Sequence, residues 1–252
     1  MQKRKKLGRG VAIVGAGMSK FGMFPEKDSR DLLIEAFHEM LSSVDKGFDP
    51  RDIEASYVGN FSNDFFAGQG HWGPIVSDWL GLTPKPATRT EGACAASALA
   101  FREACFAIAS GFYDIVLACG LEEMSKRSTE QVAEGLALAL DMSYEGRVGF
   151  TFPGVFAASA MAYMDKNKGA TTDHLKMVAI KSHNNAQFNS KAQYGSSIRQ
   201  TMNSKIERAK QKGQPAPTWG DEMDFLHDLK ANPMKGELTR KLVVTMNARW
   251  EG

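Results

Sequence analysis

The spacing of apolar residues predicts alternating strands and helices over the first half of the chain. Short apolar runs, typical of buried strands, lie at residues 11–17, 55–61 and 113–120. Apolar residues recur every three or four positions over 28–44 and 94–110, which indicates helices that bury one face. Alternation of this kind predicts an α/β fold, with helices on both faces of a mostly parallel sheet.

The pattern changes from about residue 126, where helical periodicity continues without strands. Helices are predicted over 128–141, 155–167 and 171–188, and a turn-rich segment at 146–154 separates the first two. The chain after residue 191 is polar and basic, which is typical of a solvated surface. We therefore expect an α/β core over residues 1–121 and a helical insertion subdomain with its tail over 122–252.

One stretch of the core, residues 84–100, joins an extended segment to a helix through a glycine turn. Cys94 follows Gly92 at the predicted start of that helix. Unpaired backbone N–H groups and the positive end of the helix dipole stabilise a thiolate there, and strand, sharp turn and helix form a nucleophile elbow. The alternative is a cysteine that only packs, the usual role of a free cysteine. That role suits Cys105, on the apolar helix face, and Cys119, inside an apolar run.

The glycines that end the first apolar run invite comparison with a dinucleotide-binding loop. After Gly15 and Gly17, however, the third glycine of that motif falls on Lys20, and no helix pattern begins there. This spacing argues against a dinucleotide-binding site.

Aromatic residues gather in the loop that follows the second apolar run. Phe61, Phe65, Phe66 and Trp72 lie within twelve residues of one another. Such residues pack between layers or subunits, or they form an apolar wall for a substrate or a neighbouring subunit. The sequence leaves both interpretations open.

Composition argues against several classes of partner and cellular location. A net charge of +2 gives no reason to expect nucleic acid as a partner. Three cysteines without close pairing argue against a disulfide framework and against a metal site such as zinc. The sequence contains neither a signal-peptide pattern nor an apolar run long enough to cross a membrane. We expect a cytoplasmic protein that does not bind membranes.

Several motifs occur together in one order along residues 10–195. They are Lys20-Phe21-Gly22, EGACAAS at 91–97, ASGFYDIVLACGLEEMS at 109–125, Phe152-Pro153-Gly154 and KSHNNAQFNSKAQY at 181–194. In these motifs the chain resembles the thiolase superfamily, in particular the acetyl-CoA acetyltransferases of the archaeal-type and sterol-carrier-protein-type branch.

The resemblance implies an acyltransferase that acts on CoA thioesters as substrates and holds no bound cofactor. The cysteine that matches Cys94 takes the acyl group, for Claisen condensation or for thiolysis of a 3-oxoacyl-CoA. The resemblance also implies a ligand segment near the pantetheine of CoA, and the basic residues beyond it are candidates for its phosphates. These candidate residues are Phe152, Pro153, Gly154, Arg199, Lys205 and Arg208.

The sequence departs from the family where the second thiolase half is expected. That half supplies a histidine and a second cysteine, and His227 lies in neither of the family's histidine motifs. We expect the first half plus an insertion over 122–245, which needs a second half or subunit for turnover. The resemblance further implies a homodimer through the extended segment 86–91 and a small zinc-containing OB-fold partner. Alternatives are a non-catalytic subunit that binds acyl-CoA or lipid or serves as a scaffold, and a relative of the ketoacyl or hydroxymethylglutaryl-CoA synthases.

Overall fold

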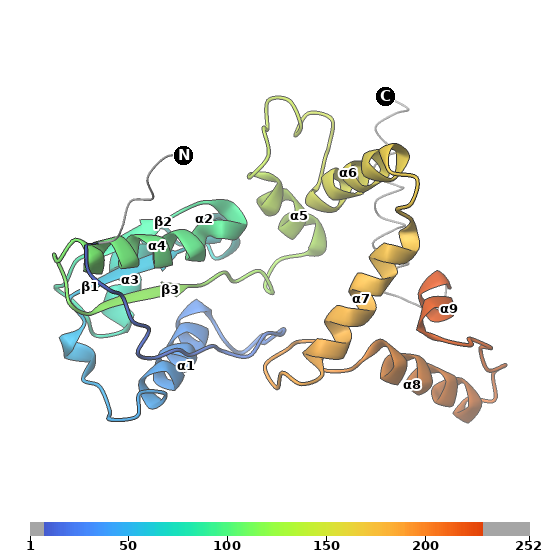
Figure 1. Ribbon diagram of the computed structural model, residues 1–252, viewed down its shortest axis with the longest axis horizontal. Helices are drawn as coiled ribbons and strands as arrows, with labels where there is room; N and C mark the ends of the chain where they lie inside the picture. Colours follow the sequence, from blue (N-terminus) through green and yellow to red (C-terminus); the bar gives the residue numbers. More distant parts are fainter. Residues whose placement is uncertain (1–7, 229–252) are drawn as a thin grey trace. The chain divides into compact units, whose positions relative to one another are not determined.

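The computed structural model describes residues 8–228, and its contacts divide the chain into two compact units, 1–139 and 140–252 (Figure 1). Helix α5 (Thr129–Ala137) belongs to the first unit. Its Gly135 lies so close to α2 (Asn63–Phe66) that an added Cβ would be 2.4 Å from Cε1 of Phe66. The compact unit thus extends past residue 121. The boundary of the α/β core at residue 121 stays a prediction.

The first unit is built on a small parallel sheet. Its order in the described chain is β2 (Ala87–Thr90), β1 (Ala55–Gly59), β3 (Val116–Gly120), and both pairings are parallel. Gly59 is in register with Thr90 on one side and with Gly120 on the other. The carboxyl ends of all three strands are therefore level, and the predicted parallel sheet is confirmed.

Helices cover both faces of this sheet, as the α/β interpretation requires. Helices α1 (Ser29–Ser42) and α3 (Trp72–Trp79) share one apolar core with Val58 of β1. Because neighbouring residues of a strand point to opposite faces, Gly59 points away from that core, and it lies against Ser97 of α4 (Ala96–Ala109). The layered fold predicted from the sequence is confirmed.

Short side chains let α4 lie close to its face of the sheet. Its buried residues are alanines that recur mostly at intervals of four, so they form one stripe along the helix. They are Ala96, Ala100, Ala104 and Ala109. On the other face, α1 begins at a capping box in which Asp28 accepts the N–H of Asp31 and the Asp31 side chain accepts the N–H of Asp28.

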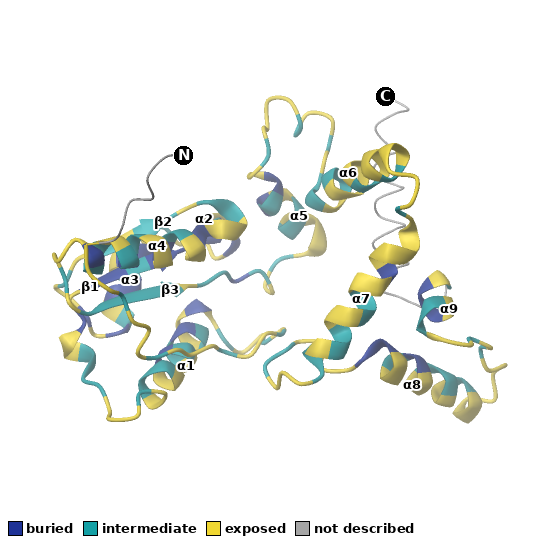
Figure 2. Ribbon diagram, in the orientation of Figure 1, coloured by how far each residue is buried: buried dark blue, intermediate teal, exposed yellow. Residues whose placement is uncertain are grey.

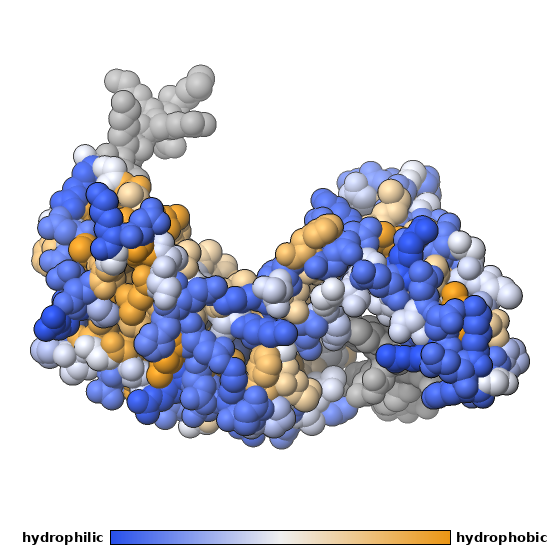
Figure 3. All heavy atoms as spheres, turned by 90° about the horizontal axis from the view of Figure 1, so that it is seen from below, coloured by the Kyte–Doolittle hydropathy of each residue, from blue (hydrophilic) through white to orange (hydrophobic). Residues whose placement is uncertain are grey.

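The predicted strand over residues 11–17 is wrong, because this segment is not paired with the sheet. The N–H of Ala16 donates to Oγ of Ser43 (2.9 Å), and the N–H of Met18 donates to the Glu39 carboxylate (2.6 Å). The backbone donors thus bind α1 side chains instead of a neighbouring strand. The segment lies along a groove of about 400 Å³ between α1, α4 and β3. Hydrophobic residues gather on this side of the first unit (Figure 3).

The second unit is helical, as predicted for the insertion. It contains α6 (Phe152–Lys166), α7 (Thr172–Ala186), α8 (Ile198–Gln211) and α9 (Glu222–His227). The sequence analysis predicts only a polar surface where α8 lies, yet the capping box of Ser197 and Gln200 begins a helix there. A small core joins α8 to α9 through Ile198, Met202, Phe225 and Leu226.

Helix α6 differs from its neighbours, because none of its residues is buried (Figure 2). Phe156, Met161 and Tyr163 are each more than 60% exposed. Residues 229–252, which include the end of the predicted insertion and tail, lie outside the described part. Within the described part, no helix is long and apolar enough to cross a membrane.

Candidate active site

Cys94 lies on the turn between β2 and α4, with an exposed side chain. The structure corrects its predicted place at the helix start, because Ala93–Ala95 form one turn of 3-10 helix and α4 begins at Ala96. Ala93 adopts a left-handed conformation, with a φ of 49°. Its N–H donates to Oε1 of Glu91 at 2.6 Å, which holds the turn in place. The order predicted for this region, extended strand, turn and helix, is confirmed.

Two strand-end glycines allow this turn to approach the sheet. A Cβ on Gly59 would lie 2.4 Å from the Cα of Ser97, and one on Gly120 would lie 1.9 Å from its Oγ. A side chain at position 59 would therefore push the helix backbone away, and one at position 120 would displace at least the Ser97 hydroxyl. Thr90 at the end of β2 adds a hydrogen bond from its Oγ1 to the carbonyl of Ala96 (3.0 Å). All three strand ends therefore hold the start of α4, which begins two residues after Cys94.

Polar groups at the same strand ends hold the loop after β1. The Glu122 carboxylate accepts the N–H groups of Phe61 (2.9 Å) and Ser62 (3.0 Å). Burial raises the pKa of Glu122, and these two hydrogen bonds oppose the rise. Asn60 donates from Nδ2 to the carbonyl of Leu121 (2.8 Å). The sequence pattern does not predict either role, although Asn60 and Glu122 follow the ends of two predicted strands, at the edge of an α/β sheet where active sites lie.

An ion pair braces this loop from β2. Arg89 binds both carboxylate oxygens of Asp64 through Nη1 and Nη2, and its Nη2 also donates to the carbonyl of Phe61 (2.8 Å). Arg89 lowers the pKa of Asp64, mainly through the hydrogen bond between the two side chains. The loop is thus tied to β2 and to β3 at the end of the sheet where Cys94 lies.

The other two cysteines occupy the packing positions that the sequence predicts. Cys119 lies in β3 and packs against the apolar core, and burial raises the pKa of its thiol to about 12. Cys105 lies on α4 and is partly buried. Of the three cysteines, Cys94 alone is exposed.

The ligand segment expected near pantetheine is helical and not a loop. Phe152, Pro153 and Gly154 form the first turn of α6. Thr151 caps this turn by accepting the Gly154 N–H on its Oγ1 (3.3 Å), and proline suits a first helical turn because its missing N–H has no partner there. The Phe152 ring stacks on that of Phe156, with centroids 6.2 Å apart. The sequence itself signals this helix start, because Pro153 follows the capping residue Thr151 by two positions.

The three basic candidates for CoA phosphates lie together on α8, in the second unit. Arg199 donates from Nε and Nη2 to the two carboxylate oxygens of Glu222, each at 2.8 Å, so its charge is already paired. Lys205 lies 5.3 Å from the centre of the Phe225 ring, and burial lowers its pKa. Arg208 is exposed one turn further along. The structure places these residues on one helix of the second unit, whereas Cys94 belongs to the first unit.

No group of three or more His, Cys, Asp or Glu side chains within residues 8–228 is placed to hold a metal ion. The described geometry offers one exposed thiol, on a braced turn at the carboxyl ends of a parallel sheet.

Comparison with known proteins shows which family this chain resembles. The sequence profile described as "Thiolase, N-terminal domain" matches residues 11–229. The acetyl-CoA acetyltransferase of Methanothermobacter thermautotrophicus is 38% identical over 198 residues, which cover 78% of this chain and 50% of the relative. That of Methanocaldococcus jannaschii is 38% identical over 186 residues, covering 74% and 46%. The chain spans about half the length of these curated relatives.

A more distant sequence relative and one solved structure extend the comparison. Sterol carrier protein 2 of Gallus gallus is 28% identical over 195 residues, which cover 74% of this chain and 34% of the relative. The structure described as "Ltp2-ChsH2(DUF35) aldolase" superposes with a TM-score of 0.51 and 21% identity, covering 73% of this chain and 45% of that one. At this identity the superposition supports a shared fold.

Proposed function

Because the chain belongs to the thiolase family, we propose that it is the acyl-accepting half of an acyl-CoA acyltransferase, with Cys94 as the nucleophile. One observation carries this proposal: the exposed cysteine sits on a turn held by all three strand ends. The printed names of the archaeal relatives, acetyl-CoA acetyltransferases, support the substrate class.

The chemistry suits a thiol in this position. The Cys94 thiolate attacks the carbonyl carbon of an acyl-CoA, the carbon–sulfur bond of CoA breaks, and CoA leaves as a thiolate that takes up a proton. The carbanion of a second acyl-CoA then attacks the acyl-cysteine, forms a carbon–carbon bond and releases the cysteine thiolate. Thiolysis of a 3-oxoacyl-CoA is the reverse. The covalent intermediate divides one difficult step into two easier ones.

Turnover also needs proton transfer, which we propose comes from a second thiolase half or subunit. General acid–base catalysis typically contributes a factor of about 10² to 10⁴ in rate. The exposed rings of Phe101 (48% exposed) and Phe106 (50%) on α4 support an additional partner, because such apolar surface is typical of an interface.

Two further partners belong to the same proposal. Strand β2 lies at one edge of the described sheet, so a second copy of the chain can pair along it and form a homodimer. The printed name of the solved aldolase joins two components, Ltp2 and ChsH2(DUF35). By analogy with such an assembly, a small zinc-containing OB-fold protein is a proposed partner of this chain.

The test is the mass of the intact protein after incubation with acetyl-CoA and longer acyl-CoAs. We expect the chain to gain the mass of one acyl group, with peptide mapping placing it on Cys94. Cys94→Ser should abolish the adduct, and Cys105→Ser, a matched control on the helix that follows the turn, should retain it. Equal acylation of the Cys94→Ser variant would overturn the assignment.

A second candidate function is a non-catalytic subunit that binds acyl-CoA or serves as a scaffold. The surface of α6 favours it, since an apolar helix without buried residues is suited to a ligand or a partner. The same experiment separates the two. Saturable CoA binding by the folded chain, without any adduct on Cys94, would favour the binding subunit.

A further inference from the structure

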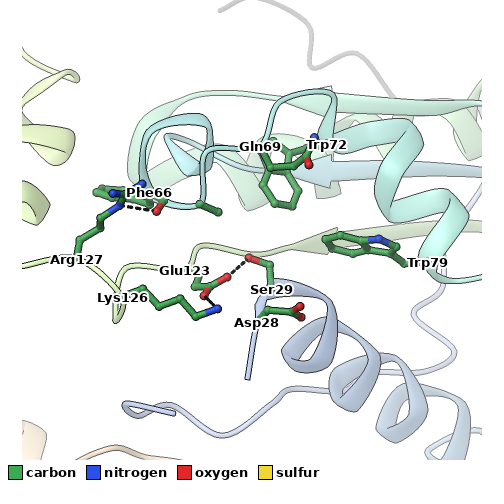
Figure 4. Close-up of a pocket in the computed structure, with 10 residues that line it drawn as sticks. Asp28, Ser29, Phe66, Gln69, Trp72, Trp79, Glu123, Lys126 and Arg127 are labelled. Carbon is green, nitrogen blue, oxygen red and sulfur yellow. Dashed lines mark hydrogen bonds and ion pairs between the residues drawn. The ribbon is translucent and has the colours of Figure 1, made fainter. Parts of the chain in front are cut away.

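Two acidic side chains after β3 join parts of the chain that lie far apart in the sequence. Glu122 binds the loop after β1. Glu123 accepts a hydrogen bond from Oγ of Ser29, at the start of α1 (2.6 Å, Figure 4). Glu91, which follows β2, differs from both, because it is exposed and binds the N–H of Ala93, only two residues further on. Glu91 therefore acts locally, on the turn that carries the exposed thiol.

Ala93 has a backbone conformation that alanine does not favour. Its φ of 49° lies in the left-handed region, where a Cβ approaches the following carbonyl oxygen too closely. Without a restraint, Ala93 would relax toward a negative φ. The next residue is Cys94, so a change of φ at Ala93 would move the thiol with it.

The hydrogen bond between Ala93 and Glu91 opposes this relaxation. The first N–H groups of a helical turn have no partner within the turn, and Oε1 of Glu91 supplies one at 2.6 Å. A hydrogen bond that involves an ionised group is roughly twice as strong as one between neutral groups. Packing restrains the neighbouring residue, because a Cβ on Gly92 would lie 2.4 Å from Cδ1 of Leu99. The turn is thus held by packing at Gly92 and by a carboxylate at Ala93.

We propose that Glu91 is a positioning residue for acyl transfer to Cys94, and that it acts by keeping Ala93 in the left-handed conformation. This inference rests on the proposed function of Cys94. Covalent attack needs the reacting atoms aligned about 3 to 3.5 Å apart, and a displacement of about 1 Å costs about 10²-fold in rate. Iodoacetamide, a small reagent that reaches an exposed thiol from several directions, makes a weaker demand on alignment. Loss of the Glu91 carboxylate should therefore slow acylation more than alkylation.

The first test compares these two reactions of Cys94 in the full chain. The rates of acylation by acetyl-CoA and of alkylation by iodoacetamide are measured by intact-protein mass and peptide mapping, on variants shown to be folded by urea denaturation. In Glu91→Ala we expect acylation to slow at least about tenfold, and alkylation of Cys94 to change by less than about threefold. Undiminished acylation, or equal slowing of the two reactions, would overturn the inference.

Two further variants show whether the acceptor oxygen is responsible. Glu91→Gln keeps an oxygen that can accept the Ala93 N–H, so its acylation rate should stay within about threefold of the wild type. A rate as low as that of Glu91→Ala would contradict the proposed hydrogen bond. Glu103→Ala removes a carboxylate of α4 that pairs with Arg102 (2.7 Å). It is the matched control and should be acylated as the wild type is.

A double variant tests the left-handed conformation itself. Glycine adopts a positive φ about as readily as a negative one, so Ala93→Gly removes the penalty that Glu91 offsets. We expect Glu91→Ala/Ala93→Gly to be acylated at least about threefold faster than Glu91→Ala. A carboxylate that instead touched the substrate could not be replaced in this way, so the absence of any recovery would overturn the inference.

These outcomes are distinct from a failure of the proposed function. If the folded wild type forms no acyl adduct on Cys94, the proposed function is overturned, and this inference with it. If the wild type is acylated and the Glu91 variants do not behave as expected, the inference alone is overturned.

Discussion

Gly59 and Ser97 are in backbone contact across the interface between β1 and α4, so that a Cβ on Gly59 would lie 2.4 Å from the Cα of Ser97 and 2.5 Å from its nitrogen. No rotation of a side chain relieves such a contact, because both atoms belong to the backbone of the helix. The position of the Cys94 turn therefore depends on a missing side chain in the neighbouring strand.

Gly59→Ala should accordingly destabilise the protein and displace the turn. Overpacking of this kind costs about 1 to 3 kcal/mol, and we expect the free energy of unfolding, measured by urea denaturation, to fall by about 2 kcal/mol. Acylation of Cys94 should slow in the folded fraction. The control is Gly10→Ala, because a Cβ on Gly10 meets no atom within 4 Å. Equal stability of the two variants would contradict the packing argument.

Cys94 and Cys119 should differ sharply in their reaction with iodoacetamide. With a pKa of about 12, Cys119 has roughly one thiolate in ten thousand thiols at pH 8, and the thiolate is the reactive form. We expect alkylation of Cys94 alone in the native protein, and of all three cysteines in urea. Peptide mass mapping after a short pulse measures this. Comparable native labelling of Cys119 would show that its surroundings are not those described.

The same shift predicts a loss of stability at alkaline pH. The unfolded thiol ionises near pH 8.5, and the folded one near 12. The unfolded state therefore loses its proton first as pH rises. The contribution of Cys119 is fully present below about pH 8.5 and is lost as pH rises toward 12. Cys119→Ala should flatten this part of a stability profile measured by urea denaturation.

Local signals in the sequence predicted most elements of the first unit. The cap at Asp28 and the apolar spacing after it are sufficient to indicate α1, and the apolar runs indicate β1 and β3. The apolar run over 11–17 predicts a strand that does not form, because backbone N–H groups of this region donate to the side chains of Ser43 and Glu39, which come later in the chain. Apolar content predicts burial, but it does not predict which backbone partner a segment finds.

The candidate site shows the same limit. Cys94 could be found from its neighbours in the sequence, because the glycine turn and the alanine-rich helix are adjacent to it. The close contact of Ser97 with Gly59 and Gly120 could not be found in this way, because the three residues lie in separate segments of the sequence. Arg199 shows another limit, because its basic character suggests a phosphate ligand but does not reveal that Glu222 binds it in the folded chain. Its role as a phosphate ligand stays a prediction.

The ion pair of Asp64 and Arg89 should support stability only above acid pH. Folding lowers the pKa of the Asp64 carboxyl. The ion pair therefore contributes its full stability above the pKa of Asp64 in the unfolded chain, near 3.9. This stability is lost as pH falls through the pKa of Asp64 in the folded chain. Both side chains are partly exposed, so we expect Asp64→Asn to cost about 0.5 to 1 kcal/mol at pH 7. The difference from wild type in urea unfolding should shrink as pH falls below about 3.9.

The matched control for that pair is Asp165→Asn. Asp165 and Lys168 form an exposed pair on one helix end, with 84% and 80% of the side chains accessible. Screening by solvent leaves such a pair with little effect, so stability should not change at either pH. A pH-independent effect of Asp64→Asn would show that the loop depends on something other than this ion pair.

The basic residues of α8 should separate into one structural residue and one ligand residue. Arg208 is exposed, so Arg208→Gln should weaken CoA binding about threefold in a calorimetric titration, and added salt should reduce this difference, as expected for exposed charges. Arg199 is bound to Glu222 through two hydrogen bonds, so Arg199→Gln should leave CoA affinity unchanged and lower the thermal stability of the chain slightly. Dephospho-CoA, which lacks the 3′-phosphate, is the matched ligand, and we expect Arg208→Gln to bind it as the wild type does. Loss of CoA affinity in Arg199→Gln, with Arg208→Gln unaffected, would instead mean that CoA displaces Glu222 from Arg199.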